Sequence, residues 1–146
     1  MYEVFAFDTK EIIDFALKTA MATASGLLIG LEREFKGKSA GLKTNGLVAI
    51  GAAVFVMISL KFQNENYVDV TRVLGQVVTG IGFLGAGVIL QKKDKIKGLT
   101  TAATVWCSAG AGCLAAVSMF FELIVLTIIV IVINLVFGYL DSKIGS

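Results

Sequence analysis

The sequence contains no histidine and no proline, and only two of its 146 residues are cysteines. Without histidine, a Ser-His-Asp triad, a histidine-ligated metal and a histidine pH switch are all excluded. Charged residues are scarce at 16%, against roughly 25% in soluble domains, and hydrophobic residues make up 56% of the chain. This composition indicates an integral membrane protein. With no credible pair of nucleophile and base in the apolar stretches, we expect no enzyme activity.

Five apolar stretches are long enough to cross a bilayer as helices, because a hydrocarbon core of about 30 Å takes roughly 20 helical residues. The predicted spans cover residues 12–31, 44–60, 73–91, 99–117 and 123–140. The 43 residues from 98 to 140 contain a single charge, Glu122, and we expect the chain to fold back there. Asp14 and Lys18, four residues apart in the first span, can pair on one helix face. The sequence therefore predicts an all-α membrane protein, a single domain over residues 1–146 that forms a bundle of five transmembrane helices in the lipid bilayer.

Basic residues are distributed unevenly between the predicted loops, which indicates the orientation in the membrane. One side carries nine of them, in the first loop, the third loop and the C-terminal tail: Arg33, Lys36, Lys38, Lys43, Lys92, Lys93, Lys95, Lys97 and Lys143. The other side carries three, Lys10, Lys61 and Arg72. We therefore expect the N-terminus outside and the C-terminus in the cytoplasm. The net charge of only +2 gives no sign of a nucleic-acid partner, and we expect none.

A glycine-rich stretch lies within the third predicted span. Gly80, Gly82 and Gly85 match the dinucleotide pattern G-x-G-x-x-G, but no acidic residue stands about 20 positions further on to bind a ribose. Small residues at spacings of three and four instead predict close helix packing. The packing residues are Gly75, Thr79, Gly80, Gly82, Gly85, Ala86 and Gly87. A break in the helix at 80–87 is the alternative. We expect this span at the centre of the bundle or at a subunit contact, with self-association most simply as a dimer.

Charged residues stand at the ends of the predicted spans. The run Glu-Arg-Glu at 32–34 closes the first span, where we expect a solvated boundary. A buried ion-pair network with Lys43 or Arg72 is the alternative, because charge placed inside a membrane is costly and usually functional. At the start of the third span, Asp69 and Arg72 are three residues apart and are expected to pair.

Polar residues are few inside the predicted spans. No Asp or Glu lies in the middle of any span, which argues against a carboxylate-lined cation path, and we expect no metal site. We expect most of the polar side chains there to form interhelical hydrogen bonds: Gln76, Thr79, Thr100, Thr101, Thr104 and Asn134. Cys107 and Cys113 are six residues apart and face different ways round a helix, so they are predicted to be small buried residues rather than a redox or metal pair.

Three segments together resemble the MgtC/SapB family of bacterial membrane proteins. They are GLERE at 30–34 running into AGLKTN at 40–45, TGIGFLGAGV at 79–88 and GLTTAATVWCS at 98–108. The resemblance covers roughly residues 12–140. By this resemblance, signature positions are held by the glycine run 80–87 and by Arg33, Glu34, Gly41, Thr44, Arg72, Gly98, Thr100, Thr101, Trp106 and Cys107. Glu32, Asn45 and Asp69 are further candidates for ion pairs or partner contacts. Lys43 departs from the arginine usual in the family, which replaces a fork-shaped donor with a point charge.

The resemblance also implies a location and a role. It implies a multi-pass protein of the bacterial inner membrane, without a cofactor, that regulates adaptation to low magnesium and virulence through membrane partners such as the F-type ATP synthase. Transport of magnesium or another cation is the alternative. If a partner is bound, we expect Glu32, Arg33, Glu34 and Lys43 to shape the cytoplasmic end of the fold. Many members carry a soluble C-terminal domain, which we expect this chain to lack because it ends six residues after Leu140.

Overall fold

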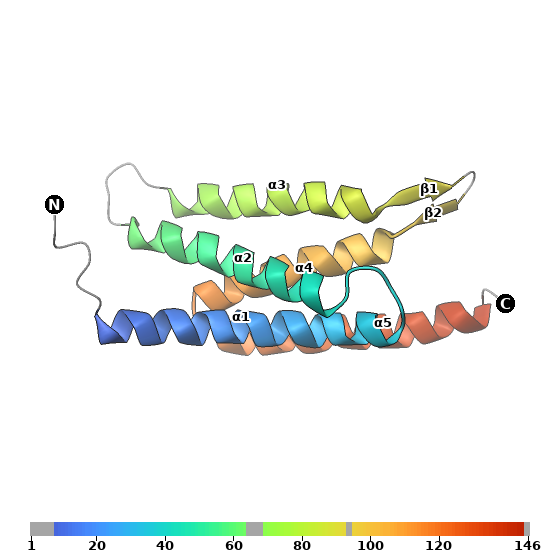
Figure 1. The fold of residues 1–146 in the computed structure, drawn as a ribbon, viewed down its shortest axis with the longest axis horizontal. Coiled ribbons are helices and arrows are strands. Elements are labelled where there is room, and N and C mark those ends of the chain that lie inside the picture. Colours follow the sequence, from blue (N-terminus) through green and yellow to red (C-terminus); the bar gives the residue numbers. More distant parts are fainter. Residues whose placement is uncertain (1–7, 64–68, 93–94, 145–146) are drawn as a thin grey trace.

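The computed structural model describes residues 8–63, 69–92 and 95–144, and these form a helical bundle with one small β-hairpin (Figure 1). The helices are α1 (Thr9–Phe35), α2 (Leu42–Lys61), α3 (Val70–Val88), α4 (Leu99–Ala116) and α5 (Phe120–Ile144). The strands β1 (Leu90–Lys92) and β2 (Lys95–Lys97) pair antiparallel between α3 and α4. All five helices are long and apolar enough to cross a membrane. The predicted bundle of five helices of membrane-spanning length is therefore confirmed, whereas its orientation stays a prediction.

The helices begin and end a few residues away from the predicted spans, because capping side chains set these ends as well as hydropathy. Asp8 accepts a hydrogen bond from the backbone N–H of Lys10 at 3.0 Å and starts α1 at Thr9. Asp69 likewise starts α3 at Val70, three residues before the predicted span. The predicted pair within α1 is confirmed, with Lys18 Nζ 2.6 Å from Asp14 Oδ2.

The predicted reversal at Glu122 is misplaced by a few residues. Helix α4 ends at Ala116 and α5 begins at Phe120, so the chain turns over residues 117–119. Ser118 has a φ of 62°, a left-handed conformation suited to a tight reversal. Glu122 lies in the first turn of α5, where its negative charge faces the positive end of the helix dipole.

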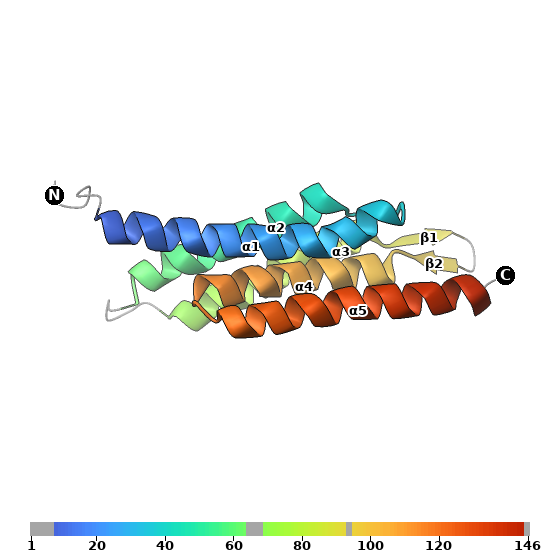
Figure 2. The same cartoon turned by 90° about the horizontal axis from the view of Figure 1, so that it is seen from below.

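The core is built from small side chains where α1, α2 and α4 meet. In Figure 1, α3 lies along one long edge of the bundle and α1 and α5 along the other, with α2 and α4 between them. Figure 2, turned by 90°, shows that α1 and α5 run in the same direction. The fully buried core residues include Ala22, Ala49, Ala53, Val56, Ala111, Ala115 and Ala116. Small residues let helix backbones approach closely, which is how helices associate when lipid supplies no hydrophobic driving force.

Helix α3 lies at the edge of the bundle, so its predicted place at the centre is wrong for the single chain. Of its 19 residues, all described, Gly85 alone is buried. The helix runs unbroken from Val70 to Val88, and the alternative of a break at 80–87 is wrong as well. A subunit contact, the other place expected for this span, stays a prediction.

Candidate functional site

Two adjacent charged residues are buried at the end of α1. Glu32 is 8% exposed and Arg33 is 5% exposed. The guanidinium Nη2 of Arg33 donates a hydrogen bond to Thr101 Oγ1 in α4, at 2.7 Å. The predicted solvated boundary is therefore wrong for these two residues, because both side chains turn towards the neighbouring helices. Arg33 joins α1 to the first turn of α4.

Glu32 pairs with a lysine that the sequence analysis did not single out. Lys36 Nζ lies 3.1 Å from Glu32 Oε1 and donates a hydrogen bond to the backbone oxygen of Asn134 in α5, at 3.3 Å. The alternative network through Lys43 or Arg72 is thus replaced by a pair one helical turn apart. Neither carboxylate oxygen of Glu32 accepts a hydrogen bond of good geometry from the described part of the chain. The i,i+4 spacing of Glu32 and Lys36 was the sequence signal for this pair.

The loop from α1 to α2 is closed by Glu34 and Gly41. Glu34 Oε2 accepts a hydrogen bond from the backbone N–H of Leu42, the first residue of α2, at 3.3 Å. A side chain at position 41 would collide with the Glu34 carboxylate, so Gly41 leaves room for this contact. Lys43 and Thr44 follow in the first turn of α2, and both are exposed.

Asn45 is a fully buried polar residue that connects this loop to α4. Its Nδ2 donates to the backbone oxygens of Ala40, at 2.5 Å, and Gly41, at 3.0 Å. Its Oδ1 accepts from Ser108 Oγ at 2.8 Å. Three partners satisfy a side chain that would otherwise be costly to bury. The amide therefore fixes the start of α2 against α4.

Besides Thr101, only Thr104 and Asn134 of the six polar residues expected to do so form an interhelical hydrogen bond among the described residues. Thr104 Oγ1 in α4 lies 3.3 Å from Asn134 Nδ2 in α5. Ser25 Oγ in α1 and Thr127 Oγ1 in α5 are 2.6 Å apart, a contact that sequence reasoning missed because Thr127 is isolated in a strongly apolar run. Thr79, by contrast, donates to the backbone oxygen of Gly75 within its own helix.

The close glycine contacts lie on α1 and α4 rather than on α3. A Cβ atom added to Gly26 would stand 2.6 Å from the backbone oxygen of Asn45, and one added to Gly30 would stand 2.7 Å from that of Gly41. An added Cβ at Gly112 would lie 3.0 Å from Ala52 Cβ in α2. The spacing of four between Gly26 and Gly30 was the missed sequence signal.

The predicted packing glycines of α3 have little around them. A Cβ added at four of these positions would meet no atom of the described chain within 4 Å: Gly75, Gly80, Gly82 and Gly87. One added to Gly85 would make an ordinary contact with Ala102 Cβ at 3.6 Å. Gly75 and Gly82, seven residues apart, share one face of α3, whereas Gly80 lines the groove towards α2. Close packing of the face with Gly75 and Gly82 thus requires a partner outside the single chain.

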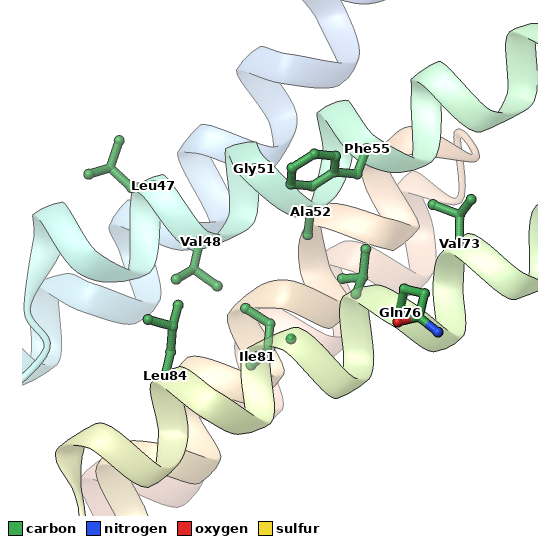
Figure 3. A pocket seen from close by; sticks show the side chains of 11 residues that line it. Leu47, Val48, Gly51, Ala52, Phe55, Val73, Gln76, Ile81 and Leu84 are labelled. Atoms are coloured by element: carbon green, nitrogen blue, oxygen red, sulfur yellow. The ribbon is translucent and has the colours of Figure 1, made fainter.

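An apolar groove of about 530 Å³ separates α2 from α3 (Figure 3). Phe55 of α2 and Leu84 of α3 are among its lining residues, and Gln76 is the one polar side chain in that lining. Gly51 of α2 and Gly80 of α3 both line the groove. A Cβ added to either glycine would meet no described atom within 4 Å. The two helices therefore leave an apolar surface open between them.

Asp69 and Arg72 lie at the start of α3. The Asp69 carboxylate accepts hydrogen bonds from the N–H of Thr71, at 2.9 Å, and from its hydroxyl, at 2.6 Å. These bonds lower the pKa of Asp69 below its ordinary value, to which the charge of Arg72 adds little. Asp69 thus serves as a helix cap bonded to Thr71 rather than as the predicted partner of Arg72.

The last group of residues implied by the resemblance lies in and before α4. Gly98 precedes α4 with a φ of 95°, and a side chain there would collide with the backbone oxygen of Val88. Thr100 and Trp106 are exposed, whereas Cys107 is half-buried and not in a disulfide. Within the described ranges, no three His, Cys, Asp or Glu side chains gather to hold a metal ion.

Comparison with known proteins places the chain among membrane proteins of one family. The model of the MgtC family matches residues 19–143. Protein MgtC of Salmonella typhimurium is 43% identical over 132 residues, which are 90% of this chain and 56% of that protein. Protein MgtC of Brucella abortus is 44% identical over 125 residues, 86% of this chain and 52% of that protein. The chain thus spans about half the length of the curated relatives it matches. No solved structure matches it.

Proposed function

The chain belongs to the MgtC family of membrane proteins, and from this premise we propose that it acts without catalysis, through contacts between its helices and those of a membrane partner. The observation that carries the proposal is the position of α3. This helix is exposed along most of its surface, and four of its glycines have no close neighbour in the described chain. Helices with small-residue faces associate closely in lipid.

One such partner is a second copy of the chain, which binds through α3 to form a dimer. Among other proteins of the bacterial inner membrane, the F-type ATP synthase is the first partner to test, because the sequence resemblance implies it. The role in low-magnesium adaptation and virulence rests on the same resemblance. Supporting a contact role, two buried hydrogen bonds to α4 fix this end of the bundle: Arg33 of α1 donates to Thr101, and Asn45 of α2 accepts from Ser108.

Cation transport is the competing function, and ion flux separates the two. The purified chain is reconstituted into sealed liposomes that contain a magnesium-sensitive dye. Influx of Mg²⁺ is then compared with that into protein-free liposomes. We expect equal traces, because Mg²⁺ gives up its water reluctantly and the buried oxygens of Asn45 and Thr104 already have partners. Saturable, protein-dependent flux of Mg²⁺ would overturn the contact role.

A further inference from the structure

The groove between α2 and α3 has the length and the lining of a site for one lipid acyl chain (Figure 3). Its volume of about 530 Å³ lies in the range of roughly 300–1,000 Å³ that is typical of ligand sites. Its lining on α3 runs from Val73 to Leu84, a length of about 17 Å at 1.5 Å per residue. One leaflet of the hydrocarbon core is about 15 Å deep. The groove therefore matches a single acyl chain of one leaflet.

Glycines on both helices leave space in this groove. Gly51 of α2 and Gly80 of α3 line it, and a Cβ atom added to either would meet no described atom within 4 Å. A bilayer provides no hydrophobic driving force to close such a gap, because lipid tails are as apolar as the side chains. For the same reason, an acyl chain gains little by leaving its neighbouring lipids. Selectivity for one lipid must therefore come from polar groups at one end of the groove.

Such polar groups stand at the start of α3. Gln76 is exposed and is the one polar side chain in the lining. Arg72, also exposed, lies four residues earlier and thus on a neighbouring position of the same helix face. Helix α3 has 19 residues and is about 28 Å long, so its start reaches the headgroup boundary of a hydrocarbon core of about 30 Å. Arg72 is its third residue, and Gln76 lies about 6 Å deeper.

The Arg72 guanidinium is free to bind a ligand. It forms no ion pair with a described residue, whereas Lys61, at the end of α2, is paired with Glu11 at 2.9 Å. The neighbouring carboxylate of Asp69 is held at the helix cap by two hydrogen bonds from Thr71. Long helical side chains lean towards the N-terminal end of their helix, so the guanidinium is directed to the membrane surface. Its planar fork matches a phosphate group through two parallel hydrogen bonds.

We propose that the groove between α2 and α3 binds an anionic glycerophospholipid, of the phosphatidylglycerol class, by its phosphate and one acyl chain. The Arg72 guanidinium donates to the phosphate, and the Gln76 amide donates to an ester carbonyl. The acyl chain passes Gly80. A headgroup ammonium would place a second positive charge beside Arg72, which favours a headgroup without one. The groove lies on a different side of α3 from Gly75 and Gly82, so the lipid leaves that face open for another helix.

Native mass spectrometry of the purified chain compares phosphatidylglycerol with a glycosyl diacylglycerol of identical acyl chains, which has a sugar in place of the phosphate. We expect phosphatidylglycerol to be retained about fivefold better, because one basic residue beside an anionic lipid contributes about 1 kcal/mol. Arg72→Gln removes this preference. The matched control, Lys10→Gln, changes an exposed basic residue in the first turn of α1, at the same end of the bundle, and keeps the preference (Figure 1).

The proposal is overturned if the parent chain retains the two lipids equally. It is also overturned if Arg72→Gln leaves the preference unchanged, or if Lys10→Gln lowers it as much as Arg72→Gln does. The comparison of the two lipids on the parent chain is decisive without any variant. Because retention is read from the mass of the single chain, none of these outcomes depends on contacts between α3 and another protein.

Filling the groove tests the place of the acyl chain. Gly51→Leu has room for its first side-chain atom and lies on α2, away from the exposed face of α3. We expect it to lower retention of phosphatidylglycerol at least about fivefold, because overpacking has that cost or more. Gly87→Leu, the matched control, adds the same side chain on α3 outside the lining, where a Cβ also meets no described atom, and retains the lipid as the parent does. Parental retention by Gly51→Leu excludes the groove as the site.

Discussion

Arg33 Nη2 in α1 donates a hydrogen bond to Thr101 Oγ1 in α4, at 2.7 Å and across 68 positions of the chain. Both side chains are buried, Arg33 to 5% exposure and Thr101 to 5%. This bond turns a charge at the end of a helix into a connection between two helices, and it makes Arg33 a structural residue of the bundle.

Loss of the Thr101 hydroxyl should destabilise the fold. Thr101→Val keeps the shape but leaves the buried guanidinium without this partner, so we expect the free energy of unfolding to fall by about 1–3 kcal/mol. Thr100→Val is the matched control, because Thr100 is exposed and its loss should change stability by less than about 0.5 kcal/mol. Unfolding by denaturant in detergent micelles measures both. Equal effects of the two substitutions would contradict the role given to Arg33.

Asn45 should tolerate substitution poorly. Asn45→Val removes the amide bonded to Ser108 Oγ and to the backbone oxygens of Ala40 and Gly41. Ser108 still donates to the Thr104 oxygen and the backbone N–H of residue 45 still donates to the Gly41 oxygen, so we expect a loss of about 1–3 kcal/mol in the free energy of unfolding. Thr44→Val, at the exposed preceding position, serves as the control for loss of a polar side-chain group in the same helical turn. The prediction fails if both variants melt at the temperature of the parent chain.

Glycines on α1 and on α3 should respond to substitution in opposite ways. Gly30→Ala places a Cβ atom 2.8 Å from Leu42 Cα, and overpacking of this kind costs about 1–3 kcal/mol. Gly75→Ala meets nothing within 4 Å in the described chain and should be neutral or stabilising by up to about 1 kcal/mol. Thermal unfolding of the monomeric chain in detergent compares them. Greater damage from Gly75→Ala would show that the close helix contacts have been assigned to the wrong helices.

Gly82→Leu should weaken self-association without unfolding the chain. A leucine side chain at this exposed position has room in the single chain but would hold a second helix away from α3. Val136→Leu, on the exposed part of α5, introduces the same residue outside the proposed contact. Energy transfer between labelled copies in liposomes reports association, and circular dichroism reports folding. Association of Gly82→Leu at the strength of the parent would exclude this face as the dimer contact.

The five helices could be predicted because bilayer thickness sets the length of an apolar span, and the Asp14–Lys18 pair because its spacing is purely local. Tertiary contacts were harder. Spacing shows that Gly75 and Gly82 share a face but not which helix covers that face, whereas Gly26 and Gly30, four residues apart, do contact α2. The burial of Glu32 was missed because charges at the end of a span usually reach water. Here α4 and α5 extend alongside the end of α1 and contact Arg33 and Lys36.

The short β-hairpin was also beyond prediction. Its strands have three residues each, and the basic sequence there reads as a topology signal rather than as a strand pattern. Gly98 ends the hairpin with a left-handed backbone that only a glycine adopts easily. The close approach to the backbone oxygen of Val88 also requires a glycine at this position, and no local sequence pattern predicts that contact.

The central claim is that α3 packs against a helix of another protein molecule, and photo-crosslinking in bacterial membranes tests it most directly. A photoreactive phenylalanine analogue replaces Phe83 of α3, which is 81% exposed, or Phe137 of α5, which is 59% exposed, as the matched control. We expect a discrete protein adduct, a second copy or an ATP synthase subunit, from position 83, lost in Gly82→Leu and absent from position 137. Lipid adducts alone at position 83, or the same protein adducts from both positions, would contradict the account.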